Sequence, residues 1–309
     1  MKNGNSNKGL NKANKDKYDE FYTQLSDIER ELGHYKEHFK DMVVFCNCDD
    51  PEESNFWLYF SLNFEYLGLK KLIATHFGNG RPSYKLELIK DGTTIKTPLK
   101  QNGDFRSPEC IEILKEADIV VTNPPFSLFR EFVAQLIEYN KKFVIIGSLN
   151  AISYKDIFKF IKENKLWLGY GFNGGNAYFR THNTKEFADG VYNKETGLVK
   201  FRNVTWFTNL EIRKRHEDLI LYKKYTGNEN EYSKYDNYDA INVDKTKDIP
   251  IDYKNTMGVP ISFLDRYNPE QFEIIGQMVT TKVDEFNHGY PYINGKKIYA
   301  RILIRNKKA

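Results

Sequence analysis

The sequence predicts an α/β protein with a doubly wound, mostly parallel sheet, followed by a smaller region. Between about residues 42 and 149, short runs rich in Val and Ile alternate with segments whose apolar residues recur at helical spacing. After about residue 165 this alternation gives way to strand-like runs separated by Gly and Asn. Ligands of doubly wound sheets bind beyond the carboxyl ends of the strands, so we expect functional residues there.

The first half of the sheet is predicted from segments with contrasting periodicity. Residues 18–39 end in a helical pattern whose apolar side chains share one face. The run 42–50 is typical of a buried strand, stopped by two carboxylates and Pro51. The run 55–69 predicts an apolar helix ending near Gly68, because glycine commonly terminates helices. The remaining elements of this half are a strand at 70–77 and a hairpin at 84–97 around Asp91-Gly92.

The second half begins with a helix over residues 107–117, for which Ser107 is a credible cap and Pro108 a favourable first residue. A strand over 118–122 follows, and helical spacing resumes a few residues later. The remaining predicted elements are a helix containing Leu128, Phe129, Phe132, Val133 and Leu136, a buried strand at 141–149, strand-like runs at 166–179 and 197–210, and a closing hairpin at 291–305 around Asn294-Gly295.

The chain is expected to divide into three parts. Residues 1–17 are polar and rich in Asn and Lys, which predicts a disordered tail, and residues 18–210 form the α/β domain. A second, smaller region covers residues 211–309. No apolar run approaches the roughly 20 residues that a membrane span needs, and the N-terminus has no apolar core of a signal peptide. We therefore expect a cytoplasmic protein without a membrane partner.

Charge and cysteine content narrow the partners only slightly. The net charge is +4, but the segment from Pro291 to the end contains six basic residues and no acidic ones. A basic end suits a polyanion, and a solvated terminus explains it equally well. The three cysteines make neither a disulfide framework nor a four-ligand zinc site, so no metal is expected. Cys46 and Cys48 are compatible with a ligand pair, and small strand residues are the favoured interpretation.

The strand at 118–122 runs directly into Asn123, Pro124, Pro125 and Phe126. Two prolines cannot continue a buried strand, because each lacks the N–H that pairing needs. The Asn123 carboxamide oxygen and the Pro124 carbonyl could accept both N–H groups of a nucleobase amine and draw it towards tetrahedral geometry. Phe126 offers a face on which an extruded base could stack. A simple turn is the alternative, and the position between a strand and a helix favours a site.

These four residues match the Asn-Pro-Pro-Phe variant of the motif of S-adenosylmethionine-dependent amino-methyltransferases. In addition, "DEFYTQLSDIERELGHY", "VVFCNCDDP", "GDFRS", "TNPPFS" and "VTWFTNL" occur in this order. The set resembles the EcoRI-type adenine-specific DNA methyltransferases from about Asp19 to the final hairpin. The resemblance implies a Rossmann-like methyltransferase fold, S-adenosylmethionine as methyl donor and double-stranded DNA as substrate. A restriction endonuclease sharing the DNA site, without direct contact, is a further possible partner.

The resemblance also implies roles for individual residues. Asn123 to Phe126 would hold an adenine flipped out of the duplex, because its N6 cannot be reached within the stack. Asp104 and Phe105 are similar to the pair that binds the adenine of the donor. The last hundred residues would read the DNA target, with basic side chains on phosphates. The implied donor-binding residues are Phe21, Tyr22, Thr23, Cys46, Asn47, Cys48, Asp49, Asp104 and Phe105; Trp206 would stack on the target base beside Phe126; and Lys296, Lys297, Arg301 and Arg305 would contact phosphate.

Two departures from the family pattern concern the donor. The usual Phe-x-Gly-x-Gly loop is replaced by Phe-Cys-Asn-Cys-Asp at residues 45–49, with no glycine. Asp49 or Asp50 could bind the amino group of the donor, or both could cap the following helix. The carboxylate that usually binds the ribose is also absent at the end of the second strand, where His76 is a possible substitute.

Other interpretations remain open from the sequence. The same motif serves enzymes that methylate cytosine N4, RNA or protein glutamine, although Asn123 favours adenine. The glycine-free loop is also compatible with a DNA-binding relative that has lost catalysis. Trp206 and Phe207 could equally be core residues of a strand. The basic run at 213–215 is interpreted as a solvated face.

Overall fold

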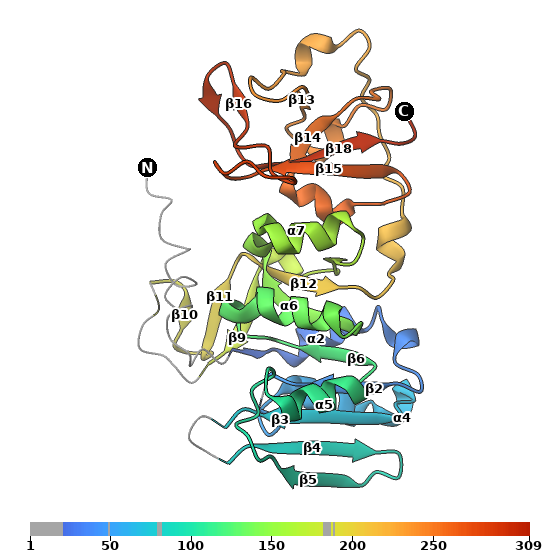
Figure 1. The fold of residues 1–309 in the computed structure, drawn as a ribbon, viewed down its shortest axis with the longest axis vertical. Helices are drawn as coiled ribbons and strands as arrows, with labels where there is room; N and C mark the ends of the chain where they lie inside the picture. Colours follow the sequence, from blue (N-terminus) through green and yellow to red (C-terminus); the bar gives the residue numbers. More distant parts are fainter. Residues whose placement is uncertain (1–20, 49, 79–81, 182–186, 188) are drawn as a thin grey trace. The chain divides into compact units, whose positions relative to one another are not determined.

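The computed structural model describes residues 21–309 except 49, 79–81, 182–186 and 188, so the expected tail lies outside the described residues. The chain divides into two compact units. The first unit comprises the residues up to Ala151 together with Gly169–Leu210, and the second comprises Ile152–Leu168 and Glu211–Ala309. Within the described residues, no helix is long and apolar enough to cross a membrane. Figure 1 shows the course of the chain through these elements.

The first unit is built on a mixed sheet, in which its strands have the order β5-β4-β3-β2-β6-β7-β12. The central neighbours β3-β2-β6-β7 are parallel, whereas β5, β4 and β12 are antiparallel to their neighbours. The expectation of a mostly parallel sheet therefore holds only for the centre, because a tight hairpin joins antiparallel strands. The strands are β2 (Val43–Cys46), β3 (Lys71–His76), β4 (Tyr84–Ile89), β5 (Thr94–Pro98), β6 (Ile119–Thr122), β7 (Lys142–Ser148) and β12 (Val204–Thr208).

The helices of the first unit begin and end as local sequence chemistry predicts. The side chain of Ser54 accepts a hydrogen bond from Phe56 N, and that of Ser107 from Cys110 N, both at 3.2 Å. Gly68 ends the apolar helix in the left-handed conformation, with φ of 64°. The predicted helix at 55–69 is confirmed, with a break at Asn63. The helices are α2 (Leu25–Leu32), α3 (Asn55–Leu62), α4 (Phe64–Leu67), α5 (Pro108–Glu116) and α6 (Phe129–Glu138), with short 3-10 turns at Lys36–His38, Phe126–Leu128, Leu149–Ser153 and Asn173–Gly175.

A buried carboxylate ties α2 to the segment after residue 168. Glu31 is 0% exposed, and its Oε1 accepts from the Tyr35 hydroxyl at 2.8 Å and from Tyr170 N at 2.9 Å. Its Oε2 accepts from Gly171 N at 3.0 Å. A Cβ at Gly169 would overlap Glu31 Oε1, so glycine is required for this close approach.

A second, antiparallel sheet in the first unit has the order β1-β9-β11-β10. Its strands are β1 (Tyr22–Thr23), β9 (Ala177–Arg180), β10 (Tyr192–Asn193) and β11 (Leu198–Phe201). Burial alternates along β9 and β11, so that Phe179 and Phe201 lie on one buried face. Phe21 adds its ring to this face, with centroids 6.1 Å from Phe179 and 5.0 Å from Phe201.

The second unit contains a sheet of order β13-β14-β18-β15. Lys162 of α7 donates from Nζ to the Ile275 carbonyl in β15 at 2.6 Å, which helps hold the helix on this sheet. Asn294 and Gly295 have φ of 52° and 71°, which confirms the predicted hairpin turn. The hairpin is short, however, because residues 301–306 pair with β14 and β15 instead. The elements are α7 (Lys155–Lys162), β8 (Trp167–Leu168), β13 (Ile241–Asn242), β14 (Met257–Pro260), β15 (Phe272–Met278), β16 (Tyr292–Ile293), β17 (Lys296–Lys297) and β18 (Arg301–Asn306), with 3-10 turns at Arg213–His216, Glu229–Glu231, Thr246–Asp248 and Ile261–Arg266.

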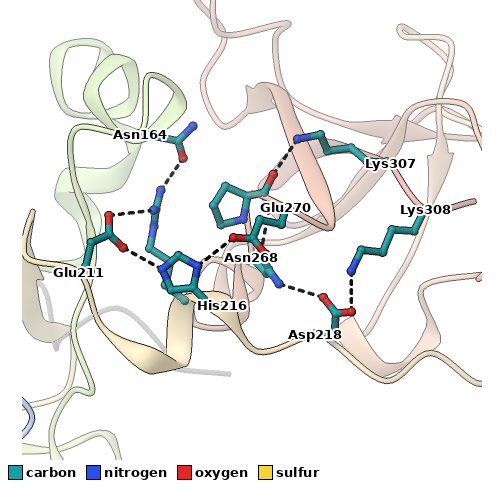
Figure 2. Close-up of polar contacts among 10 residues, drawn as sticks. Asn164, Glu211, His216, Asp218, Asn268, Glu270, Lys307 and Lys308 are labelled. Carbon is teal, nitrogen blue, oxygen red and sulfur yellow. Dashed lines mark hydrogen bonds and ion pairs between the residues drawn. The ribbon is translucent and has the colours of Figure 1, made fainter.

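Polar contacts fix the segment that enters the second unit after residue 210 (Figure 2). The imidazole of His216 lies 2.9 Å from Glu211 and 3.1 Å from Glu270, on its two ring nitrogens. Arg215 is buried, donates to Asn164 Oδ1 at 2.6 Å and lies 3.9 Å over the Trp167 ring. The interpretation of residues 213–215 as a solvated face is therefore wrong for Arg215, whose charge is held by interior partners.

His216 makes the second unit sensitive to pH. Its pKa is raised above the ordinary value, first by the hydrogen bond to Glu211 and then by that to Glu270. The stabilisation is complete below the unfolded pKa of about 6.5 and is lost as pH rises through the raised folded pKa. Because the ring is about half exposed, we expect His216→Gln to lower Tm by only about 1–3 °C at pH 6. At pH 9 the variant and the wild type should melt together in circular dichroism; an equal loss at both pH values would contradict this assignment.

Candidate active site at the carboxyl ends of the parallel strands

Three neighbouring parallel strands of the first unit end at one edge of the sheet. They have the order β3-β2-β6, and their last residues are His76, Cys46 and Thr122. Gly103 has φ of 75°, and a Cβ there would overlap the His76 carbonyl. The loop at 103–105 therefore lies directly on the end of β3. The residues that follow these strands are brought together as expected for a ligand site.

The carboxamide of Asn123 is held in one orientation. Asn123 is 7% exposed, and its Nδ2 donates to the Phe21 carbonyl at 2.7 Å. Its Oδ1 is buried and has no hydrogen-bond partner among the residues that the structure describes. A buried acceptor without a partner costs about 1–3 kcal/mol. The arrangement leaves this oxygen available for an N–H group of a ligand.

Aromatic rings surround the motif after Asn123. Pro125 is exposed and continues into the 3-10 turn at Phe126, whose ring is half-buried. The Phe126 ring is stacked towards Phe21 at 6.4 Å and meets Phe201 edge-on at 6.4 Å. Phe179 and Phe201 were not predicted as site residues, although the alternation of apolar residues along their strands could have indicated a buried face. Together the rings form one wall beside Asn123.

The segment expected to bind the donor lies beside Asn123. The Phe21 carbonyl accepts the hydrogen bond from Asn123 Nδ2, and Tyr22–Thr23 form β1. Thr23 is buried, and its carbonyl accepts from Asn55 Nδ2 at 2.6 Å. Its Oγ1 has no hydrogen-bond partner in the described segments. This segment therefore presents a second unsatisfied polar atom near the same strand ends.

The glycine-free loop after β2 is compact. Cys46 and Asn47 are buried, and Cys48 is half-buried with its Sγ 3.6 Å from Asn47 Oδ1. Asp49 lies outside the described residues. Asp50 turns back towards the end of β3, where its Oδ2 lies 3.2 Å from His76 Nδ1.

The loop at Asp104 and Phe105 is internally paired. Asp104 Oδ1 accepts from Arg106 Nε at 2.9 Å, and Oδ2 accepts from Arg106 Nη2 at 2.6 Å. This pairing raises the pKa of the Arg106 guanidinium above its ordinary value. Phe105 is buried and meets Phe132 edge-on at 5.0 Å. This loop therefore lies at the end of β3, with Phe105 packed on α6.

Trp206 does not lie in the wall beside Asn123. Its side chain is 0% exposed in β12, stacked on Phe172 at 5.6 Å and edge-on to Phe56 at 6.0 Å. Phe207 is equally buried. The expectation that Trp206 stacks on a target base is therefore corrected: core side chains occupy its surroundings, and no ring face is open to a base.

The basic residues of the C-terminal segment differ in their availability. Arg301 is 5% exposed, and its guanidinium donates to Asn242 Oδ1 and Asp244 Oδ1, both at 3.0 Å. Its expected role on phosphate is corrected, because these partners hold the charge inside the second unit. Arg305 is exposed and pairs with Glu273 at 3.4 Å. Lys296 and Lys297 are exposed on β17, with Lys297 Nζ 3.1 Å from the Tyr290 ring centroid.

Comparison with known proteins covers almost the whole chain. A profile of the family described as "Adenine-specific methyltransferase EcoRI" matches residues 9–307. The chain is 49% identical to the type II methyltransferase M.EcoRI of Escherichia coli, over 98% of both chains. It is 42% identical to the type II methyltransferase M.MpnI of Mycoplasma pneumoniae, over 97% of this chain and 98% of that one. The type II methyltransferase M.MgeORF184P of Mycoplasma genitalium is also 42% identical, over 97% of this chain and 99% of its own.

Proposed function

The chain belongs to the EcoRI family of adenine-specific methyltransferases, and from this we propose that the strand ends around Asn123 form its active site. The enzyme uses S-adenosylmethionine to methylate the N6 amine of adenine in DNA. One observation carries the assignment of the site: within the described part of the chain, the buried Oδ1 of Asn123 has no hydrogen-bond partner, while Nδ2 donates to the Phe21 carbonyl. We also propose that the parallel strands β3-β2-β6-β7 are the Rossmann-like core of the catalytic unit.

The residues at this edge fit a methyl donor. Thr23 Oγ1 is a buried polar atom without a hydrogen-bond partner among the described residues, and Phe21, Asn47, Cys48, Asp104 and Phe105 lie on segments that meet there. These residues would hold S-adenosylmethionine, whose sulfonium supplies an already activated methyl group. The protein therefore needs chiefly to bind, align and polarise.

The orientation of the Asn123 carboxamide and the residue types of the motif support a chemical role. Asn123 Oδ1 accepts one N–H of the adenine amine, and the Pro124 carbonyl accepts the other. These contacts localise the nitrogen lone pair, which is otherwise delocalised into the ring. Phe126 stacks on the adenine, which has left the duplex because N6 is unreachable inside the stack. Stacking of this kind is worth about 1–3 kcal/mol per base.

We propose that the second unit reads the target in double-stranded DNA and that the methylation protects the DNA from an endonuclease sharing the same site. The exposed Lys296 and Lys297 of β17 are the phosphate contacts favoured by their exposure. Arg305 is a secondary candidate because Glu273 already neutralises it in part.

Transfer of labelled methyl from S-adenosylmethionine to unmethylated DNA, followed by digestion, tests the reaction. The label should appear in N6-methyladenine. Label in cytosine, RNA or protein would identify a different substrate for the same mechanism. If S-adenosylmethionine raises the melting temperature of the protein but no acceptor becomes labelled, the result would favour a non-catalytic relative.

Removing the two exposed lysines should weaken DNA binding through electrostatics alone. For a Lys296→Gln, Lys297→Gln variant we expect the slope of log affinity against log salt to become shallower by about 2, uniformly across DNA sequences. Filter binding at about 50 to 300 mM salt measures this slope. A variant with Lys115→Gln and Lys165→Gln is the matched control, because both lysines are exposed and paired with glutamates. Equal slopes for the two variants would contradict the assignment.

A further inference from the structure

The donor ribose lacks an obvious acceptor, because β3 ends in His76 rather than a carboxylate. Carboxylates commonly bind ribose hydroxyls at this place in doubly wound sheets. A carboxylate from the loop after β2 lies at this place instead. Asp50, four residues beyond the end of β2, approaches His76 at the end of β3.

We propose that Asp50, positioned by His76 and Tyr84, accepts the ribose hydroxyls of the methyl donor. This inference rests on the proposed function and deepens it by naming the residue that binds one part of the cofactor.

The contacts of Asp50 fix its carboxylate at the strand end. Its Oδ1 accepts from the Tyr84 hydroxyl at 3.1 Å and from Glu52 N at 3.0 Å. Burial and the neighbouring Asp50 raise the pKa of Tyr84, so its hydroxyl stays protonated and donates. Tyr84 in turn stacks on the His76 ring, with centroids 5.0 Å apart and planes 25° apart. These contacts join the loop after β2 to the end of β3.

His76 provides an independent indication of a ligand. It is 9% exposed, and its Nδ1 is buried 3.2 Å from Asp50 Oδ2 without hydrogen-bond geometry. A buried ring nitrogen and a carboxylate oxygen that approach without bonding can both satisfy themselves on hydroxyl groups, which donate and accept at once. A vicinal diol offers two such groups at the spacing that a carboxylate can accept.

The positions of these residues along the sheet edge are compatible with the connectivity of the donor. Gly103 packs on the His76 carbonyl, so Asp104, the expected contact of the donor adenine, follows directly on the end of β3. Asp50 reaches the same strand end through His76. Asn123 lies at the end of β6, on the other side of β2. Ribose is the part of the donor that joins adenine to the sulfonium, and therefore belongs beside the expected adenine contact.

The test compares S-adenosylhomocysteine with its 2′-deoxy and 3′-deoxy analogues by titration calorimetry on the full chain. Wild type should bind the parent about 10- to 100-fold more tightly than each analogue. Asp50→Asn should weaken the parent by a similar factor and each analogue less, since each analogue has already lost one of the two contacts with Asp50. Tyr84→Phe, which releases Asp50 without touching the ribose, should reduce the preference partially.

Glu112→Gln is the matched control, because this exposed carboxylate pairs with Lys115 on the surface of α5. It should retain the wild-type preference for the diol. Equal weakening of parent and analogues by Asp50→Asn, with unchanged melting, would overturn the proposal, as would a wild type that does not distinguish the ligands. Failure of wild type to bind S-adenosylhomocysteine at all would instead overturn the proposed donor site.

Discussion

Asn123→Ala lowers the rate of methyl transfer by about 100- to 1,000-fold while leaving donor binding intact. The factor is that for removing one hydrogen-bonding group that acts on the reacting centre. The residue is buried and, among the described residues, its side chain makes one hydrogen bond, to the Phe21 carbonyl, so the loss of stability should be modest. Single-turnover rates on saturating DNA, with calorimetric donor binding beside them, separate the effects. A loss of donor affinity equal to the loss of rate would show that Asn123 is only structural.

Asn123→Asp tests the same role of the carboxamide more specifically, because the new side chain has nearly the same shape. At neutral pH the carboxylate lacks the N–H that Asn123 donates, and it faces the Phe21 carbonyl repulsively. Burial raises the pKa of such a carboxyl, and its protonated form can donate to Phe21 and accept from the amine. Activity of this variant should therefore be present below its pKa and lost as pH rises. A pH profile parallel to that of wild type would contradict the orientation inferred for the carboxamide.

Glu31→Ala is expected to destabilise the first unit more than any surface change. The substitution leaves the Tyr35 hydroxyl and the N–H groups of Tyr170 and Gly171 without their acceptor in the interior. Each orphaned group costs about 1–3 kcal/mol, so the free energy of unfolding should fall by about 3 kcal/mol or more. A fall of this size corresponds to about 6–12 °C in Tm.

Thermal melting of Glu31→Ala beside Tyr35→Phe measures the parts of this network. Tyr35→Phe removes one donor and keeps the two backbone contacts, so it should cost about 1 kcal/mol. Glu29→Ala, on the exposed face of the same helix, controls for helix propensity. Comparable Tm values for Glu31→Ala and Glu29→Ala would show that the buried contacts contribute little.

Local chemistry in the sequence accounts for the elements that it predicts well. Ser107 and Pro108 define a helix start, and Asn294-Gly295 defines a turn, because each depends on residues adjacent in the chain. The motif at Asn123 is of this kind too, since strand, prolines and helix are contiguous. The segment around Phe21 was assigned only through the resemblance, and its contact with Asn123 spans 102 residues.

The expectations that needed correction involve distant partners. Arg301 lies in a basic run, yet Asn242 and Asp244 hold it inside the unit, and no local pattern indicates them. Trp206 belongs to a strand with both faces buried, so alternation does not separate site from core. The antiparallel edges of the main sheet likewise depend on which strands become neighbours. Asp50 and His76 meet only because β2 and β3 are adjacent, which the sequence does not state.

The division of the chain has a consequence for engineering. Because Ile152–Leu168 belongs with Glu211–Ala309, the polypeptide passes between the two units three times. A fragment starting at Glu211 would lack α7, whose Lys162 donates to the Ile275 carbonyl. Grafting the sequence preference of one relative onto another by a single crossover would therefore split a folding unit. Modular exchange of specificity requires both segments to be transplanted together.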